Sequence, residues 1–310
     1  MSVTPRTALA PDTLKDRTVV LTGASDGIGR AAAAQYAAAG ATLVMVGRNE
    51  AKTAAAAARI MSDTGSRLVT WEIADLARLD AIEDLLGRLR ARHPHIHVLA
   101  NNAGAIFLER ELTADGLERT FALNHLSYVR LALGLLDHLA AAAAPGHPAR
   151  IVNVSSGAHT NAQPDLNDLQ LAQGFGGWRA YGNSKLFNIW FTRSLAARLD
   201  PAQVVVHALH PGVVSTRFAT NNGGKGRFLR RMMDLISITP AQGADTLMWL
   251  STAAEAAATT GGYWIERRVA QPSSTARDDV AAERLWQATA ALLHLDATAM
   301  IRAAGVHAVP

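Results

Sequence analysis

The chain has 310 residues, of which 49% are hydrophobic and 18% are charged, and its formal net charge is +4. This composition argues against disorder and provides enough apolar material for a large core. Because there is no cysteine, disulfide bonds and thiolate metal sites are excluded, which suits a reducing compartment. Lys and Arg are mostly dispersed along the chain, so nucleic-acid binding has no specific support.

A membrane span is not expected either. No segment reaches the roughly 18 uninterrupted apolar residues that a spanning helix needs. The N-terminus also lacks the apolar core of a secretory signal. We therefore expect a cytoplasmic protein.

Short apolar runs alternate along the chain with longer helical patterns. The predicted strands cover 18–22, 41–47, 67–73, 96–104, 149–156 and 203–212, and helices are predicted over 29–40, 50–60 and 79–92. Buried parallel strands have continuous apolar sequences, as these do. Regular alternation of strand and helix predicts an α/β fold with a doubly wound parallel sheet and helices on both faces.

The chain has no linker-like segment and no internal repeat, so we expect a single domain over residues 1–310. Its core is expected at about 15–270, with a substrate lid at about 217–238 and a C-terminal helical extension at about 278–310.

A glycine-rich turn, TGASDGIG, follows the first predicted strand and opens the first predicted helix. Gly23, Gly27 and Gly29 would let backbone N–H groups face a pyrophosphate at the positive end of the helix. Their GxxxGxG spacing differs from the GxGxxG of the common dinucleotide fingerprint. A tight strand–helix connection is the alternative, but the position after the first strand favours a cofactor site.

The end of the second predicted strand bears on the choice of cofactor. NAD-binding proteins often place a carboxylate there for the ribose 2′-hydroxyl. Here Gly47 is followed by Arg48, whose guanidinium could pair with a 2′-phosphate. This favours NADP(H), with NAD(H) as the alternative cofactor and a solvated loop arginine as the alternative role of Arg48.

Further motifs follow in a fixed order. They are NNAG at 101–104, NH at 124–125, VNVSS at 152–156, YGNSK at 181–185 and HPG at 210–212. Together with the glycine turn, this set strongly resembles the short-chain dehydrogenase/reductase family, in which GxxxGxG is the usual spacing. The resemblance implies a doubly wound sheet with the site at the carboxyl edge of the strands.

The resemblance also implies roles for individual residues. It implies a catalytic tetrad of Asn124, Ser156, Tyr181 and Lys185, with Ser156 rather than Ser155 as the family serine. The implied cofactor-binding residues are Gly23, Ser25, Asp26, Gly27, Ile28, Gly29, Arg48, Asp75, Leu76, Asn101, Ala103, Gly104, Tyr181, Lys185, Pro211, Gly212, Val214 and Thr216. Asp26 is a departure, because a basic residue often stands there in NADP-dependent members, and it counts mildly against NADP.

Longer segments narrow the resemblance. RIVNVSSGAH, YGNSKLFNIWFTRSLAARL and HALHPGVVSTRF resemble the retinol dehydrogenase and WW-domain-containing oxidoreductase branch. The long separation of Ser156 from Tyr181 also resembles that branch. The loop between them, residues 157–178, is expected to lie beside the substrate.

The implied chemistry is hydride transfer with a matching proton transfer. A free tyrosine has a pKa near ~10, which is too high for an efficient base at neutral pH. Lys185 lies about one helical turn from Tyr181 and is expected to lower that pKa, because a nearby cation favours the phenolate. Ser156 would hold the substrate oxygen, and Asn124 would help to carry the proton to solvent through water. Taken alone, the tyrosine and lysine would be ordinary neighbours on a helix surface.

Three histidines lie beside the motifs, namely His125, His159 and His210. Their spacing does not match a known metal-binding pattern, and a tyrosine already fills the acid role. We therefore predict no metal.

The sequence thus predicts an NADP(H)-preferring oxidoreductase that interconverts an alcohol with an aldehyde or ketone on a lipophilic small molecule. A ketoreductase of a steroid, quinone or polyketide-type substrate is the alternative, since the fold does not separate these. A non-catalytic NADP-sensing or scaffold protein is the alternative of another class. The segment 226–237 is expected to form an amphipathic lid, with peripheral contact with a membrane surface as its alternative. Monomer and homodimer both remain open.

Overall fold

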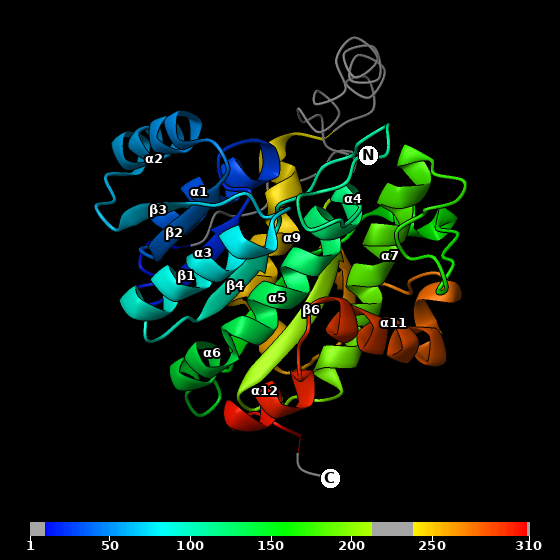
Figure 1. The fold of residues 1–310 in the computed structure, drawn as a ribbon. Helices are drawn as coiled ribbons and strands as arrows, with labels where there is room; N and C mark the ends of the chain where they lie inside the picture. Colours follow the sequence, from blue (N-terminus) through cyan, green and yellow to red (C-terminus); the bar gives the residue numbers. More distant parts are fainter. Residues whose placement is uncertain (1–9, 213–237, 309–310) are drawn as a thin grey trace.

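The computed structural model describes residues 10–212 and 238–308. Within these residues, eight strands form one sheet in the order β3-β2-β1-β4-β5-β6-β7-β8 (Figure 1). The strands are β1 (Thr18–Thr22), β2 (Thr42–Gly47), β3 (Val69–Ile73), β4 (Val98–Asn101), β5 (Ala149–Val154), β6 (Val204–His210), β7 (Tyr263–Ile265) and β8 (Arg268–Val269). Neighbouring strands are parallel as far as β7, and β8 pairs with β7 in antiparallel register. The predicted doubly wound parallel sheet is therefore confirmed, with a short unpredicted hairpin at one edge.

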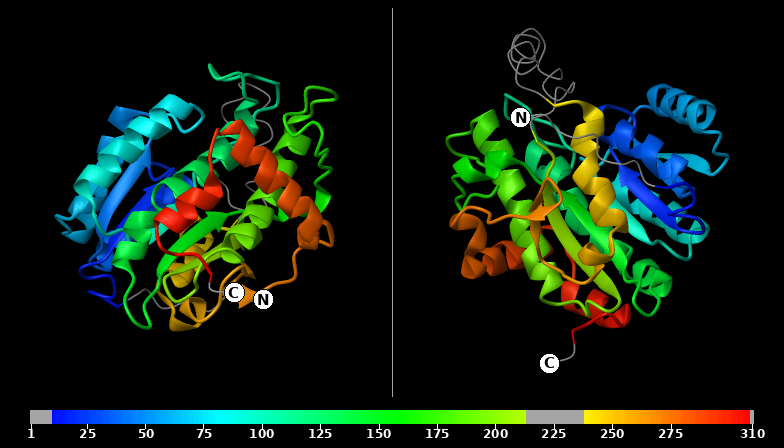
Figure 2. Two further views of the ribbon diagram at one scale, coloured as in Figure 1. Left: turned by 60° about the horizontal axis from the view of Figure 1, so that its bottom comes forward. Right: turned by 180° about the vertical axis from the view of Figure 1, so that it is seen from behind.

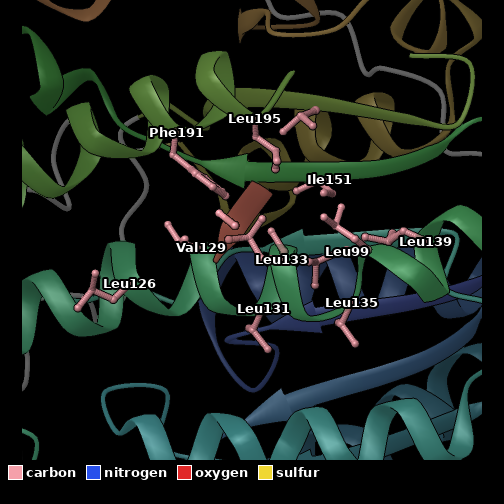
Figure 3. Packing of buried hydrophobic residues seen from close by; sticks show 14 of the residues in the cluster. Leu99, Leu126, Val129, Leu131, Leu133, Leu135, Leu139, Ile151, Phe191 and Leu195 are labelled. Atoms are coloured by element: carbon pink, nitrogen blue, oxygen red, sulfur yellow. The ribbon is translucent and has the colours of Figure 1, made fainter. Parts of the chain in front are cut away.

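Two hydrophobic clusters cover the two faces of this sheet. On one face lie α1 (Gly27–Ala38), α2 (Glu50–Thr64), α9 (Pro240–Thr252) and α10 (Ala254–Ala257). The right-hand view of Figure 2 looks at the molecule from this side. On the other face lie α3 (Leu79–Arg92), α4 (Arg119–Phe121), α5 (Ser127–Gly134), α6 (Leu136–Ala142), α7 (Gly177–Ala196), α11 (Asp279–Leu292) and α12 (Ala297–Ala303). Figure 3 shows leucines of α5 and α6 packed against the strands and α7 on this second face.

Local sequence signals explain where the first helices begin and end. Helix α1 begins at Gly27, earlier than predicted, because the Asp26 carboxylate caps it by accepting from the N–H of Gly27. Helix α2 continues to Thr64, beyond the predicted end, and stops at Gly65, which has a left-handed φ of 72°. Helix α3 has the predicted bounds.

The helices of the predicted C-terminal extension pack on the core. In α11, Glu283 accepts a hydrogen bond from Arg198, and Trp286 stacks on Phe191 of α7 with ring centroids 6.1 Å apart. The chain then returns past α12, where Val306 is fully buried. Figures 1 and 2 show both helices against the α5–α7 side of the molecule.

Two further points concern the predicted lid and the possibility of a membrane span. Most of the predicted lid, including the amphipathic segment 226–237, lies outside the described residues. None of the helices in the described part of the chain is both long and apolar enough to span a membrane.

Candidate active site

The glycine turn between β1 and α1 is packed so closely that side chains are excluded. A Cβ atom on Gly29 would lie 2.1 Å from the carbonyl oxygen of Gly23, and one on Gly23 would lie 2.8 Å from the Cα of Ala103. Gly23 also has a φ of 65°, which favours glycine. The turn therefore brings bare backbone to the N-terminal end of α1, where N–H groups and the helix dipole favour an anion.

The end of β4 is tied to this turn through Thr22. The Thr22 hydroxyl accepts hydrogen bonds from the backbone N–H groups of Asn102 (2.8 Å) and Ala103 (2.9 Å). The Asn102 amide also donates to the Thr22 carbonyl at 2.8 Å, whereas the predicted residue Asn101 turns into the sheet and donates to Asn153 at 3.0 Å. Asn102 was not selected from the sequence, although the alternation of side chains along a strand could have suggested it.

The third group of contacts lies where β2 meets α2. Gly47 ends the strand against Thr53, whose hydroxyl would be 2.1 Å from a Cβ at that glycine. Arg48 follows and is exposed. Lys52, one turn into α2, reaches back to the glycine turn and donates to the Asp26 carboxylate at 2.7 Å. The sequence did not point to Lys52 either, because its partner Asp26 lies in a different βα unit.

The remaining predicted cofactor residues lie along the same edge of the sheet. Asp75 and Leu76 follow β3, and the Asp75 carboxylate accepts from the N–H of Ala77 at 3.1 Å. Pro211 and Gly212 follow β6, and Gly212 has a φ of 88°. Ser25 and Ile28 lie within the glycine turn and are partly buried. Val214 and Thr216 lie outside the described residues.

The predicted serine and tyrosine meet at the end of β5. Ser156 follows that strand and lies close enough to Tyr181 of α7 to oppose the rise in the tyrosine's pKa. Ser155 points the other way and donates to the backbone carbonyl of Lys185 at 2.6 Å. The two serines therefore differ in their contacts. Ser155 connects the end of β5 to α7 by a hydrogen bond, and Ser156 faces Tyr181.

Lys185 is buried beside two tyrosine rings. Its side-chain nitrogen lies 5.7 Å from the ring centroid of Tyr181 and 5.6 Å from that of Tyr128, and it donates to the Val154 carbonyl at 3.0 Å. Gly104 passes so close that a Cβ atom there would be 3.3 Å from this nitrogen and 3.2 Å from the Asn124 side-chain oxygen. Residues from β4, β5 and α7 thus converge with Asn124.

Asn124 lies in a short π-helix, η1 (Ala122–Leu126), and is fully buried. Its side chain accepts from the N–H of Ala105 at 2.9 Å and donates to the Ala105 carbonyl at 2.9 Å and to Ser184 at 3.0 Å. A single π-turn inside a helix often marks a functional position. Here the π-turn places the Asn124 side chain between the segment that follows β4 and helix α7, both of which it contacts.

Burial has the largest effect on the pKa values of Tyr181 and Lys185. It raises the pKa of Tyr181 to about 12, although Ser156 acts in the opposite direction. Burial also lowers the pKa of Lys185 to about 7. The pKa of Tyr181 is therefore raised and not lowered as expected, because desolvation of the phenolate is the largest effect on it.

The three histidines beside the motifs have structural hydrogen bonds. His125 bonds to Asn188 and Thr289, His159 to the Ser156 carbonyl, and His210 to the N–H of Gly157. Across residues 10–212 and 238–308, no three His, Cys, Asp or Glu side chains gather in a way that could hold a metal ion.

A dinucleotide fits the chemistry of this edge. The glycine turn offers backbone N–H groups where an anion is favoured, and Lys52 and Arg48 supply positive charge at the β2–α2 connection. The buried side-chain oxygen of Asn101 has no hydrogen-bond partner among the described residues. The serine, tyrosine and lysine lie at the carboxyl ends of the central strands, where ligands bind in open α/β sheets.

The family model for short chain dehydrogenases matches residues 17–225. The chain therefore belongs to the short-chain dehydrogenase/reductase family, as the motifs indicate, and is an oxidoreductase that uses a nicotinamide cofactor.

Individual relatives place it in the retinol dehydrogenase-like branch. It is 38% identical to a Streptomyces protein provisionally named daunorubicin C-13 ketoreductase, over 93% of this chain and 96% of the relative. It is 36% identical to mouse retinol dehydrogenase 12, over 89% of this chain and 86% of the relative. Among solved structures, the NADP complex of Pseudomonas aeruginosa RhlG is similar, with a TM-score of 0.65, 25% identity and coverage of 82% of this chain and 96% of that chain.

Proposed function

We propose that the protein catalyses the NADP(H)-dependent interconversion of an alcohol with an aldehyde or ketone, with Asn124, Ser156, Tyr181 and Lys185 as its catalytic residues. The observation that carries this proposal is their convergence at one edge of the sheet. Ser156 faces Tyr181 and acts to lower its pKa, and the buried Lys185 amine lies 5.7 Å from the centroid of the Tyr181 ring. The glycine turn and Gly104 lie along the same edge.

Each side chain has a distinct task. When bound, the nicotinamide supplies or accepts the hydride. Ser156 donates a hydrogen bond to the substrate oxygen and orients it towards Tyr181. The Tyr181 hydroxyl gives its proton to that oxygen during reduction and takes it back during oxidation. Because its pKa is raised to about 12, Tyr181 keeps the proton at neutral pH, which suits the reducing direction.

Lys185 and Asn124 complete the proton path. A lysine with a pKa of about 7 exists in both protonation states near neutral pH and can return a proton to Tyr181. Asn124 holds the backbone of Ala105 with two hydrogen bonds, next to Gly104, where a Cβ atom would crowd both Asn124 and Lys185. The tyrosine is thereby linked to a group that exchanges protons at physiological pH.

The preference for NADP(H) is supported by the Asp26–Lys52 ion pair. Asp26 counts against a 2′-phosphate on sequence alone, but it caps α1 and pairs with Lys52 at 2.7 Å. Its charge is thus compensated, and Arg48 adds another cation on the same connection. We infer that Arg48 and Lys52 together favour the 2′-phosphate, and that NAD(H) binds more weakly.

A lipophilic substrate is supported by Trp178. This side chain is 49% exposed although it is large and apolar, and its ring lies 6.3 Å from that of Tyr181 in an edge-to-face arrangement. Gly177 fixes its position by packing against the backbone of Phe107. An exposed indole against the ring of Tyr181 provides a flat apolar wall for a ring or polyene.

The names of the relatives are consistent with this wall, since retinol and daunorubicin both carry extended conjugated systems. The ketoreductase alternative draws further support from the Streptomyces relative and from the proton held by Tyr181. We therefore expect bulky conjugated ketones and aldehydes to be better substrates than short aliphatic ones.

The proposal is tested with purified protein, NADPH or NADH, and a panel that contains retinal, polycyclic quinones, steroid ketones and short aldehydes. We expect NADPH oxidation with at least one bulky conjugated carbonyl and a lower KM for NADPH than for NADH. Tight NADPH binding without turnover of any carbonyl would support the cofactor-sensing alternative instead. Turnover with NADH alone would contradict the proposed cofactor preference.

A further inference from the structure

A chain of buried hydrogen bonds runs from the C-terminal helix α11 to the edge of the active site. Thr289 of α11 contacts the Nε2 atom of His125 at 3.3 Å. The Nδ1 atom of His125 contacts the side-chain oxygen of Asn188 in α7 at 3.1 Å. The Asn188 side-chain nitrogen then donates to the backbone carbonyls of Asn124 at 2.9 Å and Val154 at 3.4 Å.

The direction of every bond in this chain is determined by its last members. Backbone carbonyls only accept, so the amide nitrogen of Asn188 must face Asn124 and Val154. Its oxygen therefore faces His125, whose Nδ1 must carry a proton. Nε2 is then the acceptor, and the Thr289 hydroxyl donates to it. The network fixes one tautomer of His125 and one rotamer of the Asn188 amide.

All three side chains of the network are buried. His125 is 1% exposed, Asn188 0% and Thr289 2%. Aromatic rings surround the imidazole, with Phe121 stacked at 5.4 Å and Phe187 edge-on at 5.6 Å. Burial lowers the pKa of His125 to about 4, so the ring is neutral at physiological pH and does not itself carry charge.

The two carbonyls that Asn188 holds belong to the catalytic centre. One is the backbone carbonyl of Asn124. The other, from Val154, also accepts the hydrogen bond of the Lys185 amine at 3.0 Å. A shift of the Asn188 amide would therefore change both the placement of Asn124 and the environment of Lys185.

We propose that Thr289, His125 and Asn188 are positioning residues for the reaction, and that α11 thereby helps to set the geometry of Lys185 and Asn124. This inference rests on the proposed function, because it assigns the network to that catalytic centre. A role in core packing alone is the competing explanation. A positioning role predicts that turnover falls while stability and cofactor affinity change little. A role in core packing alone predicts that turnover falls only as far as stability does.

Thr289→Val tests the first link while keeping the side-chain shape. It leaves Nε2 of His125 without a donor, so we expect kcat to fall roughly 10-fold, while the Kd for NADPH and the KM for the carbonyl change less than about twofold. Thr289→Ser keeps the hydroxyl and should restore most of kcat. Thr246→Val is the matched control, since Thr246 is buried and accepts from the N–H of Arg267 at 3.2 Å, far along the chain from this network.

The kinetic result would overturn the proposal if Thr289→Val kept kcat within twofold of wild type. It would also do so if Thr246→Val lowered kcat as much, since the loss would then follow from general destabilisation. Thr289→Ser behaving like Thr289→Val would equally show that the hydroxyl is not what matters.

Nitrogen NMR of the wild-type protein gives a second test that needs no variant to fold. With ¹⁵N-labelled histidine, His125 should be neutral from pH 6 to 8 and protonated on Nδ1. A proton on Nε2 would contradict the network. Failure of the proposed function is distinguishable, because wild type would then turn over no carbonyl while the His125 tautomer stayed measurable.

Discussion

The two halves of the active-site edge are built in different ways. The half that we propose for the cofactor, called the cofactor half, comprises the β1–α1 turn and the β2–α2 connection. It relies on backbone that passes too closely for side chains, and its charged groups are partly exposed, with the Lys52 and Asp26 side chains 44% and 34% exposed. The half that we propose for catalysis, called the catalytic half, consists of buried polar side chains, of which Lys185 is 2% exposed and Asn124 0%.

This difference decides what each half is sensitive to. In the cofactor half, added volume is the main threat, because a Cβ on Gly29 has no room. In the catalytic half, the removal of charge from water dominates and shifts the pKa values of Tyr181 and Lys185. Substitutions should therefore affect affinity on one side, and turnover and pH dependence on the other.

Lys185→Met tests the catalytic half most strongly. We expect turnover to fall by about 10²- to 10⁴-fold, because the proton path to Tyr181 is broken. The NADPH affinity, measured by fluorescence titration, should fall much less. If Lys185→Met had an activity near that of wild type, Lys185 would not be needed for turnover, and the proposed division into a cofactor half and a catalytic half would be contradicted.

The same variant makes a pH-dependent prediction for stability. Burial lowers the pKa of Lys185 from 10.5 to about 7 in the folded state, so folding is penalised while the amine is charged. The penalty is complete below pH 7 and is relieved as the pH rises towards 10.5. Lys185→Met should thus be more stable than wild type at pH 6, and the difference in the free energy of unfolding should shrink by pH 9.5. A difference that is constant with pH would contradict this.

Gly29→Ala tests the cofactor half. Its methyl group would lie 2.1 Å from the Gly23 carbonyl oxygen, so the turn must move. We expect NADPH to bind roughly 10- to 100-fold more weakly, in isothermal titration. Gly87→Ala is the matched control, because a Cβ in that helix meets nothing within 4 Å, and it should leave NADPH binding unchanged. Equal affinities for both variants would show that the turn does not hold the cofactor.

Lys52→Ala sharpens the comparison by removing an exposed charge. It deletes a cation and the ion pair of that cation with the Asp26 carboxylate, and both losses oppose a 2′-phosphate. We expect the Kd for NADPH to rise about 10-fold and that for NADH to change little. Arg59→Ala, on the same helix but paired with Asp63, serves as the control. A parallel loss for NADH would mean that Lys52 only supports the fold.

Trp178→Ala should have the smallest effect. Loss of the apolar wall should raise the KM for bulky conjugated carbonyls by roughly 5- to 10-fold while changing short aldehydes little. Trp71→Ala removes another partly exposed tryptophan, on β3 at the sheet edge, and should change neither. If short aldehydes suffered as much as bulky ones, Trp178 would be a support for Tyr181 and not part of the substrate site.

The sequence was informative wherever a feature is local. The strands, the glycine turn and the ordered motifs could be predicted because each is encoded by adjacent residues. The β7–β8 hairpin was missed because its strands are too short for an alternation pattern. The division into one domain, with the lid at 217–238, remains a prediction.

Long-range pairs could not be found in this way. Lys52 meets Asp26 from the next βα unit, and Thr289 meets His125 from 164 residues away in the sequence. The pKa of Tyr181 was predicted in the wrong direction for a related reason. The sequence shows that a lysine is near, but the extent of burial depends on how α7 packs, and here burial is the larger effect.

The central claim is that Tyr181 exchanges the proton with the substrate oxygen. Its most direct test is Tyr181→Phe, compared with Tyr36→Phe, which removes another buried hydroxyl, bonded to Ser251 at 2.6 Å. We predict that Tyr181→Phe lowers kcat by about 10²- to 10⁴-fold at unchanged NADPH affinity, while Tyr36→Phe affects mainly stability. A Tyr181→Phe protein that binds NADPH normally and still reduces its carbonyl substrate at near wild-type rate would contradict the mechanism.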